Sequence, residues 1–174
     1  MTKPPELTIP TIKTERLFLR AWSMDNAEML FQILQEKDIL QYFPNPNPPS
    51  VDRVQRYIAH QLAHWQEYGY GHWAVVSQET KEVLGWVGLE YLTDVKETEV
   101  AYLLTRRVWG KGLATEAAQA AVRFGRENAG LRKIIGLVHP ENTGSARVLQ
   151  KCGLKYEQKV PLWGMDLEWY QVEY

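Results

Sequence analysis

The chain has 174 residues, of which 45% are hydrophobic and 24% charged, a composition typical of an ordinary globular protein with a sizeable core. Its 20 lysines and arginines nearly balance 21 acidic residues, and the resulting net charge of -1 argues against bulk electrostatic attraction to nucleic acid or membrane. One cysteine excludes an internal disulfide, and no Cys/His cluster has zinc-like spacing, so we expect no metal site.

The opening residues contain no apolar stretch of the kind found in signal peptides, and no run approaches membrane-spanning length. We therefore expect a cytoplasmic protein. The sequence shows no internal repeat, low-complexity segment or interdomain linker, and we expect a single domain over residues 1–174.

The N-terminal part of the chain predicts one strand and a first helix. Residues 1–13, rich in Pro and Thr, are expected to be an irregular lead-in, and the alternating pattern of residues 16–22 indicates a strand. Ser23 or Asp25 is placed to cap the helix, and the prolines within 44–49 cannot continue it. The apolar face of this helix repeats at helical spacing through Met29, Leu30, Ile33 and Leu34.

A second helix is predicted to begin after Ser50 and to end at Gly69. Beyond it the hydrophobic period changes from helical to strand-like. Residues 72–77 and 83–92 predict a hairpin, and 97–105 predict a third strand of the same antiparallel meander.

The C-terminal half predicts a helix, a strand, a short helix and two final strands. An alanine-rich helix is expected to end at Gly130, and the apolar run 133–138 is typical of a strand buried on both faces. Gly153 closes the short helix, before strands near 155–160 and 165–173. The order β-α-α-β-β-β-α-β-α-β-β predicts an α/β fold, with a mixed sheet, one parallel crossover and helices on both faces.

The segment "RRVWGKGLATEA", residues 106–117, joins the third meander strand to the alanine-rich helix. Gly110 and Gly112 remove side chains where the first amides of a helix lack partners and the helix dipole is positive. The pattern predicts a loop that binds a phosphate-like anion. The alternative is a tight turn that needs positive φ and binds nothing. Three cationic side chains lie around the same loop, namely Arg106, Arg107 and Lys111.

Two common nucleotide-binding motifs fit this loop poorly. The dinucleotide fingerprint G-x-G-x-x-G has Thr115 in place of its third glycine, and the Walker pattern is absent.

The loop resembles motif A of the GNAT superfamily of N-acetyltransferases, whose signature Q/R-x-x-G-x-G/A corresponds to Arg107 through Gly112. The resemblance extends over nearly the whole chain. "TERLFLR", residues 14–20, resembles the first strand of the branch that acetylates ribosomal-protein N-termini, and "HPENTGSARVLQKCGL", residues 139–154, is similar to the N-x-x-S…G-[FL] ending of the superfamily.

This resemblance implies an enzyme that transfers an acetyl group from acetyl-CoA, as co-substrate, directly to a primary amine. In the superfamily the loop amides hold the cofactor's pyrophosphate, and its pantetheine enters between two splayed parallel strands. The implied cofactor-binding residues are Leu104, Arg107, Val108, Trp109, Gly110, Lys111, Gly112, Leu113, Ala114, Thr115 and Asn142.

Acetyl transfer requires that the amine lose a proton, the thioester be polarised and the leaving thiolate be protonated. The resemblance implies that Glu99 is a base acting through ordered water; the alternative is an exposed strand carboxylate beside Glu97. It further implies that Asn142 contacts the cofactor or acceptor and that Ser145 serves the leaving thiol, although helix capping alone also explains both residue types. Many relatives have a tyrosine acid where this chain has Leu149, which shifts that role to Ser145.

Three further residues are interpreted as structural: His139 as a loop residue, Cys152 as core, and Glu116 as a helix-start residue favoured by the helix dipole. The acceptor pocket is expected between the helices of residues 25–68 and the loops near Trp163. Four tryptophans are candidates for its wall, namely Trp65, Trp73, Trp86 and Trp163.

The branch resemblance favours a protein or peptide N-terminal amine as acceptor. Two alternatives remain: a small amine such as an amino acid, polyamine or antibiotic, and a non-catalytic acyl-CoA-binding sensor. The expected partners are therefore acetyl-CoA and an amine, not nucleic acid or membrane. The sequence leaves open whether the protein is a monomer or a homodimer.

Overall fold

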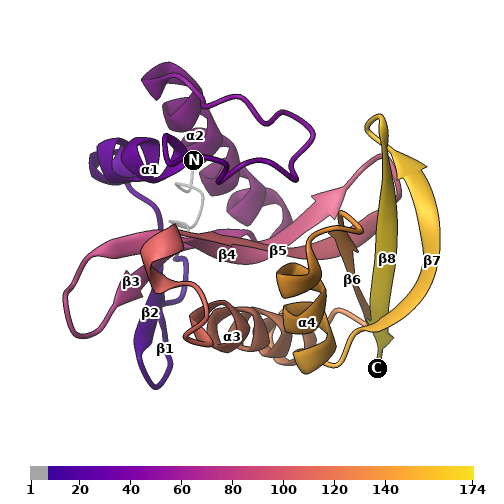
Figure 1. The fold of residues 1–174 in the computed structure, drawn as a ribbon. Coiled ribbons are helices and arrows are strands. Elements are labelled where there is room, and N and C mark those ends of the chain that lie inside the picture. The colour runs from indigo at the N-terminus through magenta and orange to yellow at the C-terminus, as the bar shows by residue number, and fades with distance from the viewer. Residues whose placement is uncertain (1–7) are drawn as a thin grey trace, which may run out of the picture.

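One mixed sheet runs through the described chain, in the order β1-β2-β3-β4-β5-β6-β8-β7 (Figure 1). The computed structural model describes residues 8–174; residues 1–7, part of the expected lead-in, lie outside that range. Within it β5 and β6 are the parallel neighbours, and the other neighbouring pairs are antiparallel. The strands are β1 (Ile12–Lys13), β2 (Leu17–Arg20), β3 (His72–Ser77), β4 (Val83–Leu92), β5 (Glu97–Leu104), β6 (Lys133–Val138), β7 (Lys155–Leu162) and β8 (Met165–Glu173).

Helices cover both faces of this sheet, α1 and α2 on one face and α3 and α4 on the other (Figure 1). Their bounds are α1 (Ala27–Leu34), α2 (Val51–Tyr68), α3 (Leu113–Glu127) and α4 (Thr143–Lys151). The predicted α/β class, with a mixed sheet between two helical layers, is confirmed. No helix within residues 8–174 is both long and apolar enough to cross a bilayer.

The ends of α2 follow from local chemistry, as predicted. The Ser50 hydroxyl accepts a hydrogen bond from the Arg53 amide at 3.3 Å, which satisfies one of the free donors of the first turn. Gly69 ends the helix at φ +74°, a left-handed conformation that a residue without a side chain adopts most readily.

Two details near the N-terminus differ from the sequence-based prediction. The first helix ends at Leu34, so the prolines within 44–49 lie outside it as predicted. However, Ile12 and Lys13, expected in the lead-in, form a short strand paired with β2. Met29 is 37% exposed, because the buried stripe of α1 runs through Ala27, Leu30, Ile33 and Leu34 and leaves position 29 at its edge.

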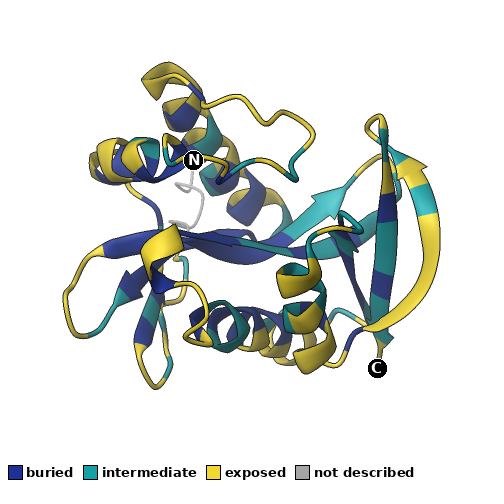
Figure 2. Cartoon of the chain, in the orientation of Figure 1, coloured by how far each residue is buried: buried dark blue, intermediate teal, exposed yellow. Residues whose placement is uncertain are grey.

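Burial is concentrated in β3 and β4 and in the helix surfaces that face the sheet, whereas β7 is mostly exposed (Figure 2). Trp73 of β3 packs edge-on against Phe124 of α3, with ring centroids 5.1 Å apart. Such a filled core leaves no room for a substrate beneath the meander. A site has to lie where the sheet is interrupted.

Candidate active site

The sheet is interrupted between β5 and β6. These strands pair at one register position, Glu99 opposite Ile135, whereas β5 pairs with β4 along its whole length and β6 with β8 along its whole length. A continuing parallel ladder would bond successive amides of one strand to carbonyls of the other. Instead, the Leu137 amide donates to the Glu99 carboxylate at 3.2 Å. The strands therefore separate beyond this point, and a side chain replaces the backbone ladder.

The glycine-rich loop lies between β5 and α3. A 3₁₀ turn, Arg106–Val108, leads into Gly110 at φ +73° and Gly112 at φ +77°. Both need the left-handed region that favours glycine, as the tight-turn alternative predicts. A Cβ on Gly110 would meet no atom within 4 Å, so the space over the loop is open as well. Gly112 is the N-cap residue of α3 and offers no side chain to its first-turn amides, which keeps them free for a ligand.

The cations around this loop divide into bound and free ones. Arg107 forms an ion pair with Glu82 at 3.0 Å, and Arg106 stacks its guanidinium 4.9 Å from the centre of the Trp109 ring. Lys111 is exposed. Arg16, which sequence reasoning did not single out, donates to the Lys111 carbonyl at 2.8 Å and so adds a positive charge beside the loop.

Glu116 fastens the start of α3 to the N-terminal strands. Its carboxylate accepts bonds from the Thr14 hydroxyl, the Arg16 amide and the Arg16 guanidinium at 2.6–2.7 Å. Burial raises the pKa of Glu116, but these three donors more than offset it and hold that pKa below its usual value. With its charge committed to Arg16, Glu116 is a helix-anchoring residue in this arrangement.

Glu99 lies half-buried at the point where the strands separate. Burial raises its pKa to about 8; the hydrogen bond from Leu137 opposes that shift, and the nearby carboxylate of Glu90 adds to it. Glu90 is the direct cross-strand neighbour of Glu99, so both side chains lie on the α2 face of the sheet. Glu99 therefore exchanges a proton in the mildly alkaline range, which suits a base acting on an amine.

The start of α4 brings Asn142 and Ser145 together. The Asn142 side chain caps the helix by accepting from the Ser145 amide at 3.2 Å. The Ser145 hydroxyl lies 2.9 Å from the Tyr102 hydroxyl, which also donates to the Ser145 carbonyl at 2.8 Å. Since Tyr102 has one proton to give, the serine hydroxyl donates to the tyrosine oxygen. Burial raises the pKa of Tyr102, and it stays protonated.

Tyr102 is a residue that sequence reasoning missed. It lies on β5, far from Ser145 in sequence, and no local motif connects the two. Side chains alternate along a strand, so Tyr102 and Glu99 project from opposite faces of β5. Among the described residues no hydrogen bond joins Glu99 to Ser145; each is held by its own partner at the edge of the interrupted sheet.

The remaining candidate residues, Leu149, Cys152 and His139, differ in their contacts. Leu149 is 1% exposed and would be the nearest neighbour of any side chain at Gly136, which places it in the core. Burial raises the pKa of Cys152 to about 12, so its thiol stays protonated, consistent with a core role. His139 stacks on Tyr42 with ring centroids 5.1 Å apart, which brings the segment between α1 and α2 over the end of β6.

The four candidate tryptophans have different surroundings. Trp65 and Trp73 are buried and pack edge-on against each other. Trp86 is buried on the α1–α2 face, stacked on His72 at 4.5 Å. Trp163 is 40% exposed in the β7–β8 turn and donates to Asp94 at 2.8 Å. Trp86 thus shares a sheet face with Glu99, and Trp163 lies at the rim.

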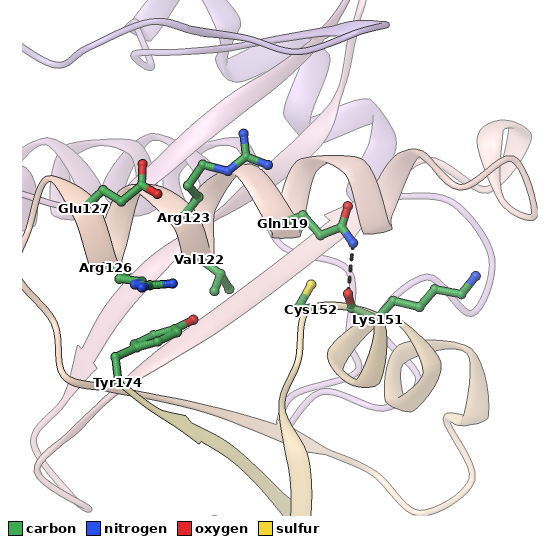
Figure 3. A pocket seen from close by; sticks show the side chains of 8 residues that line it. All are labelled: Gln119, Val122, Arg123, Arg126, Glu127, Lys151, Cys152 and Tyr174. Atoms are coloured by element: carbon green, nitrogen blue, oxygen red, sulfur yellow. Dashed lines mark hydrogen bonds between the residues drawn. The ribbon is translucent and has the colours of Figure 1, made fainter.

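Two surface hollows lie along α3, and neither includes the interrupted edge. One of about 430 Å³ lies between α3 and residues 10–15. The other, of about 310 Å³, lies between α3, the end of α4 and Tyr174 (Figure 3). Its lining is mostly polar and charged, and the Cys152 thiol that takes part in it stays protonated. Residues 8–174 also contain no group of three or more His, Cys, Asp or Glu arranged to hold a metal.

The arrangement was compared with known proteins. A family model described as an acetyltransferase (GNAT) domain matches residues 16–155. The uncharacterized N-acetyltransferase p20 of Bacillus licheniformis is 30% identical, over 84% of this chain and 83% of its own length. An acetyltransferase structure from Agrobacterium tumefaciens has a TM-score of 0.84 at 26% identity and covers 100% of both chains. The ribosomal L7/L12 alpha-N-protein acetyltransferase RimL, solved with coenzyme A, has a TM-score of 0.78 at 19% identity and covers 94% of this chain and 98% of its own.

Proposed function

The chain belongs to the acetyltransferase (GNAT) domain family and is an N-acetyltransferase, and we propose that it moves the acetyl group of acetyl-CoA to the N-terminal amine of a protein or peptide. We further propose that residues 1–174 act as one domain. The observation that carries the proposal is the coincidence, at one edge, of a free helix start and an interrupted parallel strand pair.

The glycine loop is the proposed site for the diphosphate of acetyl-CoA. The first-turn amides of α3 have no internal partner, and the helix dipole adds positive potential there. The residues proposed to line the cofactor run from Arg107 to Thr115, with Leu104 at the end of β5 and Asn142 at the start of α4. Lys111 contributes charge. Arg16 and Arg107 are paired with Glu116 and Glu82, and Arg16 also holds the loop through the Lys111 carbonyl.

The acceptor amine is proposed to reach the thioester from the α1–α2 face. The Glu99 side chain lies on this face, and Tyr42, from the segment between α1 and α2, stacks on His139 at the end of β6. The opposite face is occupied by α3 and α4 (Figure 1). Cofactor and amine would thus meet at the gap between β5 and β6.

Glu99 is the proposed base and Ser145 the proposed donor to the leaving thiolate. Ionised Glu99 accepts a proton from the ammonium group, directly or through water, and the neutral amine attacks the thioester carbonyl. The thiolate that departs takes a proton from the Ser145 hydroxyl, and Ser145 regains the second proton, which the amine nitrogen loses as the amide forms. Tyr102 stays protonated and holds Ser145 in place. Asn142 holds the backbone that carries Ser145.

A protein N-terminus is favoured over a small amine by the resemblance of residues 14–20 to the ribosomal-protein branch, and RimL shares the fold. The test is thiol release from acetyl-CoA with a panel of N-terminal peptides and, separately, amino acids, polyamines and aminoglycosides. Turnover highest with peptides supports the proposal. Turnover confined to small amines would replace the acceptor, and cofactor binding without any turnover would favour the sensor alternative.

A further inference from the structure

Polar side chains lie beneath α2, between the strand position opposite Glu99 and the surface. They come from three elements and are His60 of α2, His72 of β3 and Glu90 of β4, with Tyr57 of α2 beside them. We call these four residues the α2 cluster. The proposed function does not use them.

Glu90 is the centre of the α2 cluster. One carboxylate oxygen lies 2.9 Å from His60 Nε2, and the other lies 3.5 Å from His72 Nε2. Burial raises the pKa of Glu90, but the imidazoles of His72 and His60 outweigh it and keep that pKa below its usual value. Glu90 is therefore an anion between two imidazoles, in direct cross-strand contact range of Glu99.

The two histidines differ in exposure. The His60 side chain is 60% exposed and that of Glu90 26%, whereas His72 is 3% exposed. Burial lowers the pKa of His72 to about 4, so His72 is neutral at neutral pH. Its Nδ1 is hydrogen-bonded to the Tyr57 hydroxyl at 2.8 Å and its ring stacks on Trp86, which fixes the ring in place. Its buried Nε2 lies 3.5 Å from Glu90 but makes no hydrogen bond. His60 is the member that reaches water.

His64, one turn along α2, is a useful contrast. Its Nδ1 lies 2.7 Å from the Tyr70 carbonyl, and its Nε2 accepts the Tyr91 amide at 3.0 Å. Both nitrogens are thus occupied by backbone, and protonating Nε2 would break the bond to Tyr91. The only histidine of α2 with a nitrogen turned to solvent beside Glu90 is His60.

We propose that Glu90 and His60 carry the proton that Glu99 removes from the acceptor amine out to solvent. The inference rests on the proposed function of Glu99. Glu99, which gains the proton as the amine becomes neutral, is half-buried and must lose it before the next turnover. It passes the proton to the Glu90 carboxylate and is itself ionised again; because the pKa of Glu90 is the lower of the two, this transfer is uphill and Glu90 holds the proton only briefly. The exposed His60 ring exchanges its Nε2 proton with water, so that Nε2 can accept the proton of Glu90, and the ring then releases one proton from Nδ1 to water or buffer.

The charged and titratable groups that face this path come from four elements. They are Tyr57, His60 and His64 from α2, His72 from β3, Glu90 from β4 and Glu99 from β5. Tyr57 has its pKa raised by burial and by Glu90, and it stays protonated. The groups that change protonation in the path are therefore Glu99, Glu90 and His60.

The kinetic test uses His60→Ala, with Glu67→Gln, an exposed carboxylate of the same helix, as control. At low buffer concentration we expect His60→Ala to lower kcat by about 10-fold with an unchanged KM for acetyl-CoA. Added imidazole should restore kcat in His60→Ala and leave the wild type and control unaffected, because a diffusible base replaces the missing one. A wild-type kcat in His60→Ala, or a loss that imidazole does not restore, would overturn the proposal.

A second measurement does not depend on turnover. The NMR signals of the His60 ring should change near pH 8, where Glu99 loses its proton, and Glu99→Gln should remove that change. Identical His60 titrations in the two proteins would overturn the path even if the enzyme is active. Conversely, wild-type protein without turnover but with this coupling would contradict the proposed function alone.

Discussion

The loop before α3 and the α2 cluster lie on opposite faces of the sheet and are built in different ways. The loop takes its properties from ten consecutive residues, 106–115, and offers backbone amides. The cluster is assembled from α2, β3 and β4 and acts through side chains. A site made of backbone amides tolerates most side-chain changes but not a Cβ at its glycines. A site made of side chains keeps its fold after an isosteric substitution, but its protonation behaviour changes.

The largest effect should come from breaking the loop. Gly112→Asp puts a side chain in the left-handed region and a negative charge at the helix start, and both oppose a bound diphosphate. We expect acetyl-CoA to lose its stabilising shift in Tm, which corresponds to at least ~100-fold weaker binding.

Gly130→Asp is the matched control for that variant. Gly130 has φ +67° with open space around it, so the backbone cost is similar, but it follows the other end of α3. This variant should keep the acetyl-CoA shift. Equal binding by both folded variants would show that the cofactor does not use the start of α3.

The next effect should come from the base. Glu99→Gln still accepts the Leu137 amide but cannot take a proton, and we expect kcat to fall by roughly 10²-fold with acetyl-CoA affinity nearly unchanged. The wild-type rate should rise with pH through about 8, where Glu99 ionises. The variant should lack that inflection, and its deficit should shrink at high pH because the amine arrives neutral. A pH–rate profile equal to that of the wild type would remove Glu99 from the mechanism.

The same variant separates titration from packing in a stability measurement. The folded-state pKa of Glu99 is raised from 4.5 to about 8, so the native protein binds a proton that the unfolded chain releases, and native stability falls as pH rises through that window. Glu99→Gln has no such loss. Its Tm relative to wild type should therefore be higher at pH 9 than at pH 5, by roughly 2–4 °C for each kcal/mol involved. A difference that does not vary with pH would contradict a raised pKa.

The smallest effect should be at the start of α4. Ser145→Ala is expected to slow thiol release only several-fold, because a thiolate is already a tolerable leaving group. Tyr102→Phe should give a similar loss, since both variants break one hydrogen-bonded pair. The double variant should then be no worse than either single one, as measured by a double-mutant cycle of kcat. Additive losses would show that the two hydroxyls act separately.

Much of the fold could be predicted because the governing interactions are local. The hairpin 72–77 and 83–92, the strand 133–138 and the caps of α2 lie where residue alternation, turn residues and capping chemistry place them. Met29 and the short strand β1 were predicted wrongly, because helix rotation and edge pairing are decided by neighbours distant in sequence.

The candidate site likewise has parts that depend on adjacent residues and parts that depend on the tertiary structure. The sequence by itself determined the glycine loop, since positive φ and a helix start depend on adjacent residues. It also supplied Glu99, Asn142 and Ser145 as candidates, but only by resemblance. The tertiary structure alone decided that Tyr102 bonds Ser145, because an interstrand gap and a helix start bring them together.

The α2 cluster was likewise decided by the tertiary structure. Its histidines and its carboxylate are ordinary surface residue types in the sequence. Only cross-strand register and burial bring them together beside Glu99. Register places Glu90 beside Glu99, and packing of α2 brings His60 to Glu90. A pKa depends on every charge and dipole within a few ångströms, whatever its distance along the chain, and that is why the loop could be predicted from the sequence and the proton path could not.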